Sequence, residues 1–151
     1  MNLNQLDSEV TSENLEKAAE NGKPLDILGI YDTKKDRIQI LRDMDKMYSL
    51  TKFADIAGVN KSLLSEFFSG KKNISRIPLI RIFIALKYDY KTVQRYLRRF
   101  KCASLYVKNR WDIIVINGIN EGKGLMEIEA ELNKYTDDNG EILSLFDKKD
   151  R

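Results

Sequence analysis

Apolar residues recur every three or four positions along most of this chain, which is the spacing of helices that bury one face. The pattern predicts helices over about 36–47, 50–57, 60–69, 77–86, 93–100, 109–120 and 125–135. A short acidic helix is also expected over 12–21. The best candidate for a strand, 112–116, lacks strand alternation and fits a helical stripe as well. We therefore expect an all-α fold class.

The segment 49–73 carries the most specific local signals. Ser49 is a favoured N-cap, Gly58 can take the left-handed conformation that ends a helix, and Asn60 is a second favoured N-cap. These residues predict two short helices joined by a tight turn. In the first helix of the domain, the spacing places Ile38, Leu41, Met44 and Met47 on the buried face.

The second short helix has one apolar face and one polar face. Leu64, Phe67 and Phe68 share the apolar face, and a basic loop follows Gly70. A helix-turn-helix directs the start of its second helix at the edges of DNA bases. This geometry makes the exposed residues of the segment candidates for DNA contact.

The same segment resembles the phage-repressor type of helix-turn-helix, the Xre/Cro-like family. The positions that match the pattern of that family are Phe53, Ala54, Gly58, Val59, Asn60, Ser62, Leu64, Ser65, Phe67, Gly70, Lys71, Lys72 and Asn73. The resemblance covers roughly 36–135 and suggests a subgroup with additional C-terminal helices. It implies a five-helix repressor-like helix-turn-helix domain, extended by N-terminal and C-terminal helices.

Charge is concentrated in the middle of the chain. Residues 34–110 hold 19 Lys and Arg against 6 Asp and Glu, a net charge of +13. Residues 1–33 hold 2 against 7, and 111–151 hold 5 against 10, so each end carries −5. A basic segment that coincides with the helix-turn-helix is typical of a polyphosphate-binding protein, because each Lys or Arg near a phosphate releases counterions.

These observations predict a sequence-specific double-stranded DNA-binding protein, a transcriptional regulator that inserts helix 60–69 into the major groove. The N-terminal turn from Asn60 would present Lys61, Ser62 and Ser65 to bases, with Leu63 exposed to a thymine methyl group. Phosphates would be contacted from the start of the first helix and from the loop, by Ser49, Lys52, Lys71, Lys72 and Asn73.

Two other classes stay open. The helix-turn-helix could be the scaffold of a protein-interaction module, such as an antitoxin, adaptor or inhibitor, whose acidic termini hold a protein partner; Glu66 in the second helix favours this reading. An RNA-binding domain would need exposed aromatic rings, for which Tyr48, Tyr88, Tyr90 and Tyr106 are the candidates. A homodimer could form through C-terminal helices that carry Met126, Ile128, Ala130 and Leu132.

The amino-acid composition mainly argues against certain metal-binding and catalytic sites. With no histidine and with Cys102 as the single cysteine, the chain has neither a Cys/His zinc site nor a histidine-based catalytic pair. No spacing of residues indicates a cofactor, so we do not expect an enzyme. The first residues do not resemble a leader, and apolar runs fall short of the ~20 residues that span a bilayer. We expect a soluble cytoplasmic protein without a membrane partner.

The sequence divides into four parts. These are an acidic N-terminal arm over 1–33, the helix-turn-helix domain over 34–101, a helical extension over 102–135, and an acidic then apolar tail over 136–151. The tail could be a docked helix or a peptide for a partner.

Overall fold

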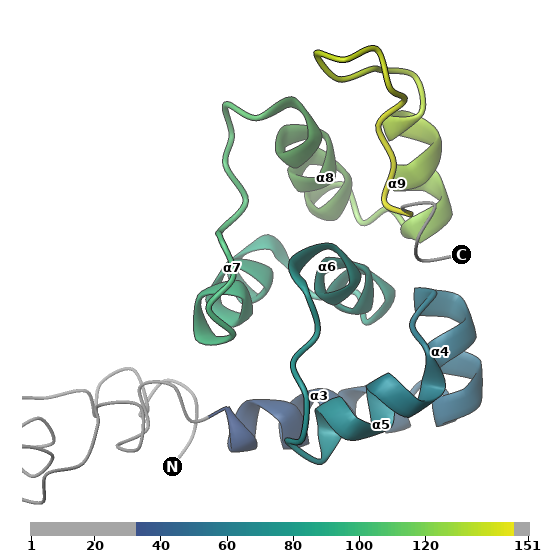
Figure 1. Cartoon of the computed structure of the whole chain (residues 1–151), viewed down its shortest axis with the longest axis vertical. Helices are drawn as coiled ribbons and strands as arrows, with labels where there is room; N and C mark the ends of the chain where they lie inside the picture. Colours follow the sequence, from purple (N-terminus) through teal and green to yellow (C-terminus); the bar gives the residue numbers. More distant parts are fainter. Residues whose placement is uncertain (1–32, 147–151) are drawn as a thin grey trace, which may run out of the picture.

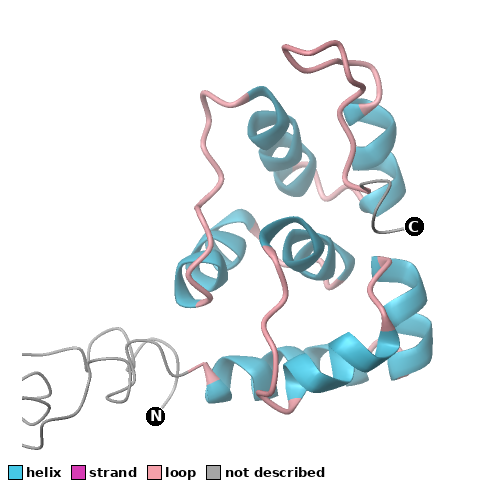
Figure 2. Cartoon of the chain, viewed as in Figure 1, coloured by secondary structure: helices cyan, strands magenta, loops and turns pink. Residues whose placement is uncertain are grey.

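The computed structural model describes residues 33–146, within which the chain forms α-helices and no strand beyond one isolated bridge between Thr136 and Ile142 (Figures 1 and 2). The helices are α3 (Lys34–Asp45), α4 (Leu50–Ala57), α5 (Lys61–Phe68), α6 (Arg76–Ala85), α7 (Tyr90–Arg99), α8 (Arg110–Asn120) and α9 (Leu125–Leu132). The all-α class is confirmed, and 112–116 is part of a helix. The helix expected over 12–21 lies outside the described residues, as does nearly all of the acidic arm.

Helix α6 is the centre of the molecule. It contacts α4, α7 and α9, whereas α3, α4 and α5 contact one another on one side of it and α8 packs against α9 on the other (Figure 1). Every residue from Leu79 to Ala85 is buried. A helix that is apolar almost all round belongs in an interior, so the sequence of α6 accounts for its place.

The two short helices α4 and α5 begin and end where their capping residues predict. Ser49 Oγ accepts a hydrogen bond from the Lys52 amide, and Asn60 Oδ1 accepts from the Ser62 amide at 2.8 Å. Gly58 between them has a left-handed backbone with φ 66°. Because side chains other than glycine rarely adopt that conformation, Gly58 ends α4 and permits the abrupt change of direction into α5.

The buried face of α3 matches the apolar spacing in part. Met44 is in the core and Leu41 packs against it, Ile38 is half-buried, and Met47 is 45% exposed beyond the end of the helix. Helix α3 also buries Ile40 and two polar residues that the spacing does not indicate, Asp36 and Arg37. Polar partners elsewhere in the fold compensate these two side chains, so the rotation of α3 follows its polar contacts as much as its apolar ones.

Buried and half-buried arginines connect segments that are distant in sequence. Arg99 of α7 forms an ion pair with Asp36 of α3 at 3.2 Å. Arg76, at the start of α6, donates to the carbonyl oxygen of Ala103 and pairs with Asp112 of α8 at 3.0 Å. The first contact attaches α7 to α3. The contacts of Arg76 attach α8 and the segment before it to α6.

The C-terminal part of the described chain shows where the tail and the apolar residues of α9 lie. The tail docks on the body as far as Phe146; residues 143–146 are not helical, the chain bends at Leu145 and Phe146, and Leu145 is fully buried. In α9, Ile128 and Leu132 belong to the core of the monomer, whereas Met126 is 68% exposed. Of the apolar residues suggested for a dimer contact, only Met126 and Ala130 are therefore on the surface.

No helix in the part of the chain that the structure describes has both the length and the apolar character needed to cross a bilayer.

Helices α8 and α9 approach so closely at Gly118 that a Cβ atom there would lie 2.5 Å from Ile128 Cγ1. We expect Gly118→Ala to lower the free energy of unfolding by about 1–3 kcal/mol, because overpacking outweighs the gain of roughly 1 kcal/mol in helix propensity. Urea denaturation measures the change. Ile128→Ala alone should cost about 2–5 kcal/mol, and the double variant should cost clearly less than the sum. Strict additivity would contradict the contact.

Candidate nucleic-acid interface

The exposed face of α5 continues onto the start of α4. Leu50 of α4 lines a shallow surface depression together with Lys61, Ser62, Ser65 and Glu66 of α5. Lys61, Ser62 and Ser65 are exposed, as the apolar spacing of α5 predicts, because Leu64 and Phe67 occupy the opposite, buried face. The polar face of α5 and the first turn of α4 thus form one surface.

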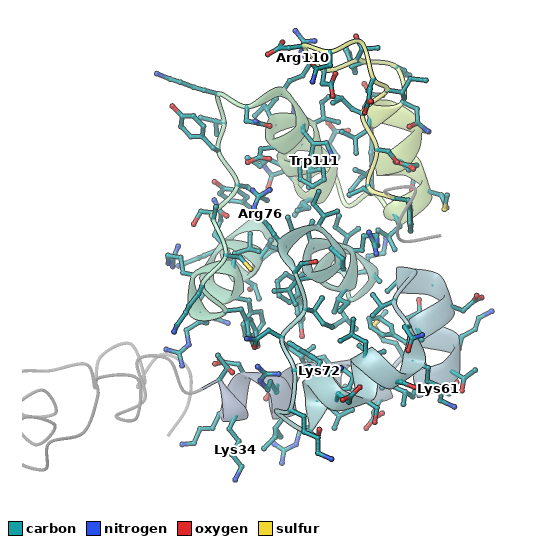
Figure 3. The ribbon with its side chains drawn as sticks, viewed as in Figure 1. Lys34, Lys61, Lys72, Arg76, Arg110 and Trp111 are labelled. Carbon is teal, nitrogen blue, oxygen red and sulfur yellow. The ribbon has the colours of Figure 1, made fainter. Side chains whose placement is uncertain are left out.

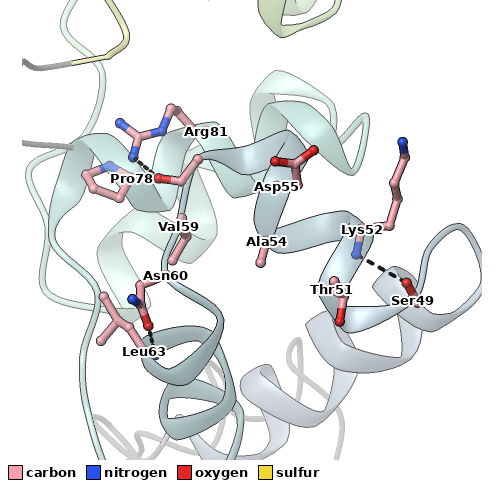
Figure 4. A pocket seen from close by; sticks show the side chains of 11 residues that line it. Ser49, Thr51, Lys52, Ala54, Asp55, Val59, Asn60, Leu63, Pro78 and Arg81 are labelled. Atoms are coloured by element: carbon pink, nitrogen blue, oxygen red, sulfur yellow. Dashed lines mark hydrogen bonds between the residues drawn. The ribbon is translucent and has the colours of Figure 1, made fainter. Parts of the chain in front are cut away.

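Leu63 departs from the expectation. It is half-buried and packs against the core instead of standing exposed beside Ser62. Its side chain borders a second, open groove that also has Asn60, Gly58, Pro78 and Arg81 in its walls (Figure 4). Leu63 is two positions after Lys61, which turns its side chain by about 200° around the helix. Leu63 therefore faces this groove and not the face of Lys61.

The starts of α4 and α5 carry the positive end of the helix dipole, which favours anions. Side-chain caps already bind part of the first-turn amides: Ser49 accepts from Lys52, and Asn60 accepts from Ser62 and Leu63. Lys52 on α4 and Lys61 on α5 are exposed beside these helix starts. Lysines beside the positive end of a helix dipole favour the binding of phosphate oxygens.

The basic loop after α5 is held by Arg37 of α3. One guanidinium nitrogen of Arg37 donates to the carbonyl oxygens of Phe67 at 2.6 Å and Lys72 at 2.8 Å, and another donates to Asn73 Oδ1 at 2.7 Å. Lys71 and Lys72 remain exposed (Figure 3 labels Lys72). The Asn73 side-chain oxygen therefore accepts a hydrogen bond from Arg37, although Asn73 itself is exposed.

Arg37 is enclosed by aromatic rings. Its guanidinium carbon lies 4.6 Å from the centre of the Phe67 ring and 5.5 Å from that of Phe100. Burial lowers the pKa of Arg37 from its ordinary value, and the neighbouring charge of Asp36 acts in the opposite direction. Arginine stays protonated under such shifts, so Arg37 remains a charged donor of several hydrogen bonds.

Glu66 connects the face of α5 to the loop. Its carboxylate lies 3.8 Å from Lys72 Nζ, and both side chains are partly exposed. An exposed pair of this kind contributes little to stability. Its relevance is geometric, because it places Lys72 next to the depression that Lys61, Ser62 and Ser65 line.

Not all of the basic residues contribute to a surface field. Arg37, Arg81 and Arg99 are buried and bind partners inside the fold. The charge count over 34–110 therefore overstates the positive surface. The side chains that remain exposed around α5 and its loop are lysines: Lys52, Lys61, Lys71 and Lys72.

The tyrosines considered for stacking on RNA bases do not form a platform. Tyr48, Tyr88 and Tyr90 are half-buried and pack against the core. The Tyr88 hydroxyl donates to Asp43, and burial together with this hydrogen bond raises the pKa of Tyr88 above its ordinary value. Tyr106 is 57% exposed, but it lies on the segment that joins α7 to α8, which is away from α5 (Figure 1).

Comparisons with protein families, with curated proteins and with solved structures found no match to this chain. Within residues 33–146, no group of three or more His, Cys, Asp or Glu side chains is placed to hold a metal ion.

The sequence pattern gives no sign that Arg37 supports the site. In the sequence Arg37 is one residue of the basic region, because the carbonyl group of Phe67 lies 30 residues away and that of Lys72 lies 35 residues away. The local pattern of α3 carries no sign of such a contact.

We expect Arg37→Lys to lower the free energy of unfolding by about 1–3 kcal/mol. Lysine keeps the charge, but its single ammonium group cannot reach the acceptors that the forked guanidinium reaches, so buried carbonyl groups lose donors. Chemical denaturation followed by circular dichroism measures the effect. Arg42→Lys, a change at an exposed position on the same helix, is the matched control. An equal loss of stability in the two variants would argue that the Arg37 hydrogen bonds do not hold the loop.

Proposed function

We propose that this protein is a sequence-specific double-stranded DNA-binding protein of the Xre/Cro-like helix-turn-helix type, and that it acts as a transcriptional regulator. The observation that supports the proposal is a continuous polar and basic surface. It runs from Leu50 at the start of α4, across the exposed face of α5, and through Glu66 to Lys72 in the loop.

In this proposal α5 enters the major groove with its N-terminal turn. Lys61, Ser62 and Ser65 are exposed on one face and can reach base edges, where each well-formed contact contributes about 1–3 kcal/mol of discrimination. Lys72 lies next to that face through its contact with Glu66, Lys71 precedes it in the loop, and Lys52 borders the second groove at the start of α4. In the proposal all three contact the phosphate backbone. The amide ends of α4 and α5 add dipoles that favour phosphate.

Glu66 has a defined part in this arrangement. In the DNA major groove its carboxylate can accept a hydrogen bond from cytosine N4. Where it faces the DNA backbone, the carboxylate repels phosphate. Its contact with Lys72 holds that lysine toward α5. Glu66 therefore narrows the set of acceptable DNA sequences more than it adds affinity.

A protein-interaction module is the alternative. It is favoured by the exposed apolar side chains of the C-terminal extension, among them Val107 at 55% and Ile142 at 65% exposure. Repressor-like domains bind paired half-sites as symmetric dimers, so the same surface can serve a second copy of the chain.

Selection of bound fragments from random duplex DNA, performed at two salt concentrations, tests the proposal directly. We expect enrichment of a defined motif, with affinity that falls as salt rises because counterions are released on binding. Absence of duplex binding even at low salt would favour the interaction module. Preference for duplex RNA or single strands at equal salt would exclude the proposed groove contact.

Replacing the loop lysines, Lys71→Glu with Lys72→Glu, should weaken binding to every duplex. A charge-assisted contact contributes about 1.5 kcal/mol, so the loss of two corresponds to about 100-fold in Kd. The slope of log affinity against log salt should flatten by about 2. Fluorescence anisotropy with labelled duplexes measures both quantities.

The matched control is Lys108→Glu with Lys134→Glu. These lysines are also exposed, but they belong to segments at the end of the molecule remote from α5 (Figure 1). The control changes net charge by the same amount. If the control variant weakened duplex binding as strongly, the loss would come from the change in net charge. A specific contact of Lys71 and Lys72 with phosphate would then be refuted.

The double change Lys61→Ala with Ser62→Ala alters the N-terminal turn of α5. It should mainly reduce the preference of the protein for one DNA sequence over others. We expect the ratio of specific to non-specific affinity to fall about tenfold or more, because base contacts contribute about 1–3 kcal/mol each. Competition between the selected duplex and a scrambled one measures the ratio. An equal loss of affinity on both duplexes would refute the division between base and phosphate contacts.

A further inference from the structure

Residues 143–146, here called the C-terminal strap, form a non-helical segment with a bend at Leu145 and Phe146, and side chains from three helices bind it. The Trp111 indole N–H of α8 donates to the Ser144 carbonyl oxygen at 2.8 Å. Glu129 of α9 accepts from the Ser144 hydroxyl at 2.6 Å and from the Leu145 amide at 2.7 Å. Arg81 of α6 donates to the Leu145 carbonyl oxygen at 2.8 Å.

The side chain of Leu145 completes this site, because it is fully buried. Each backbone polar group of Ser144 and Leu145 named above has a side-chain partner, and the one large apolar group has a pocket. Peptide-binding proteins use the same two elements: hydrogen bonds to the backbone for affinity and a side-chain pocket for specificity.

The same Arg81 holds the turn between α4 and α5. Its Nε donates to the Ala57 carbonyl oxygen at 2.8 Å, and another of its nitrogens donates to the Gly58 carbonyl oxygen at 3.1 Å (Figure 4). Carbonyl groups at the end of a helix lack intrahelical donors and carry the negative end of the dipole. One guanidinium therefore caps α4 and binds the strap.

Phe146 brings the strap into direct contact with the turn. The Arg81 guanidinium carbon lies 4.9 Å from the centre of the Phe146 ring. A Cβ atom added at Gly58 would lie 2.9 Å from this ring. The ring thus covers both the guanidinium and the residue that ends α4.

We propose that the docked strap is an intramolecular peptide ligand that controls the α4–α5 turn. With the strap docked, Arg81 and Phe146 hold Ala57 and Gly58 in place; with the strap released, water reaches these carbonyl groups and the turn loosens. The angle between α4 and α5 sets whether Lys52 and Lys61 can contact one duplex together. The consequence for DNA rests on the proposed function, whereas the coupling between strap and turn does not.

Leu145→Asp in the full chain tests the coupling, with Ile142→Asp as the matched control. Both changes place a carboxylate in the same tail, but Leu145 is fully buried and Ile142 is 65% exposed. Amide hydrogen exchange of Val59 reports the turn, because its N–H donates to the Ala54 carbonyl oxygen across the end of α4. Exchange of the Trp111 indole N–H reports release of the strap.

For Leu145→Asp we expect the exchange of the Trp111 indole and of the Val59 amide to accelerate about tenfold or more. The Lys71 amide, which closes α5 by donating to the Glu66 carbonyl oxygen, should be unchanged. Kd for the selected duplex should rise about tenfold. Ile142→Asp should alter none of these quantities.

Glu129→Ala releases the strap more mildly, because it removes only the contacts that α9 makes with Ser144 and Leu145. If Leu145→Asp unfolds the whole chain, the Glu129→Ala variant decides the test. Faster indole exchange with an unchanged Val59 amide would overturn the coupling. Faster Val59 exchange with unchanged duplex affinity would overturn control of the DNA surface. If the unmodified protein binds no duplex, the proposed function fails, and the Val59 measurement still decides whether the strap controls the turn.

Discussion

The structure depends on a buried cation that binds backbone carbonyl groups. Arg81 is 1% exposed in the middle of α6, where an arginine charge would be costly without compensation. Carbonyl oxygens of Ala57, Gly58 and Leu145 supply part of that compensation. Since these acceptors come from the end of α4 and from the C-terminal strap, the requirement to solvate one guanidinium determines where both segments lie relative to the central helix.

The same principle recurs with other arginines. Arg37 binds carbonyl groups after α5, and Arg76 binds those that precede α8, in both cases where the chain leaves regular helix and its carbonyl groups lack helical donors. The forked guanidinium suits this task because it can donate to several acceptors at once. The lysines around α5 have the other role: they stay exposed and supply positive charge to the surface that we propose contacts phosphate.

Much of the helical plan could be predicted from local patterns. Ser49, Gly58 and Asn60 mark the limits of α4 and α5 because capping depends on a few neighbouring atoms. Prediction was weaker where burial depends on a distant partner. Met47 was expected inside but is exposed beyond the end of α3, which instead buries Asp36 against Arg99 and Arg37 against the loop after α5. Leu63 was expected outside, but it borders α6. The docked position of the strap likewise depends on Trp111, Glu129 and Arg81, none of them near it in sequence.

By itself the sequence determined the helical class, the positions of the capped helices and the polar face of α5, since periodicity and capping act over one or two turns. Tertiary structure decided which basic residues are available to a partner. Arg37, Arg81 and Arg99 are indistinguishable from surface arginines in the linear pattern, and they are buried only because acceptors from remote segments meet them in the fold. Compensation of a buried charge is a property of three-dimensional proximity, which no local spacing encodes.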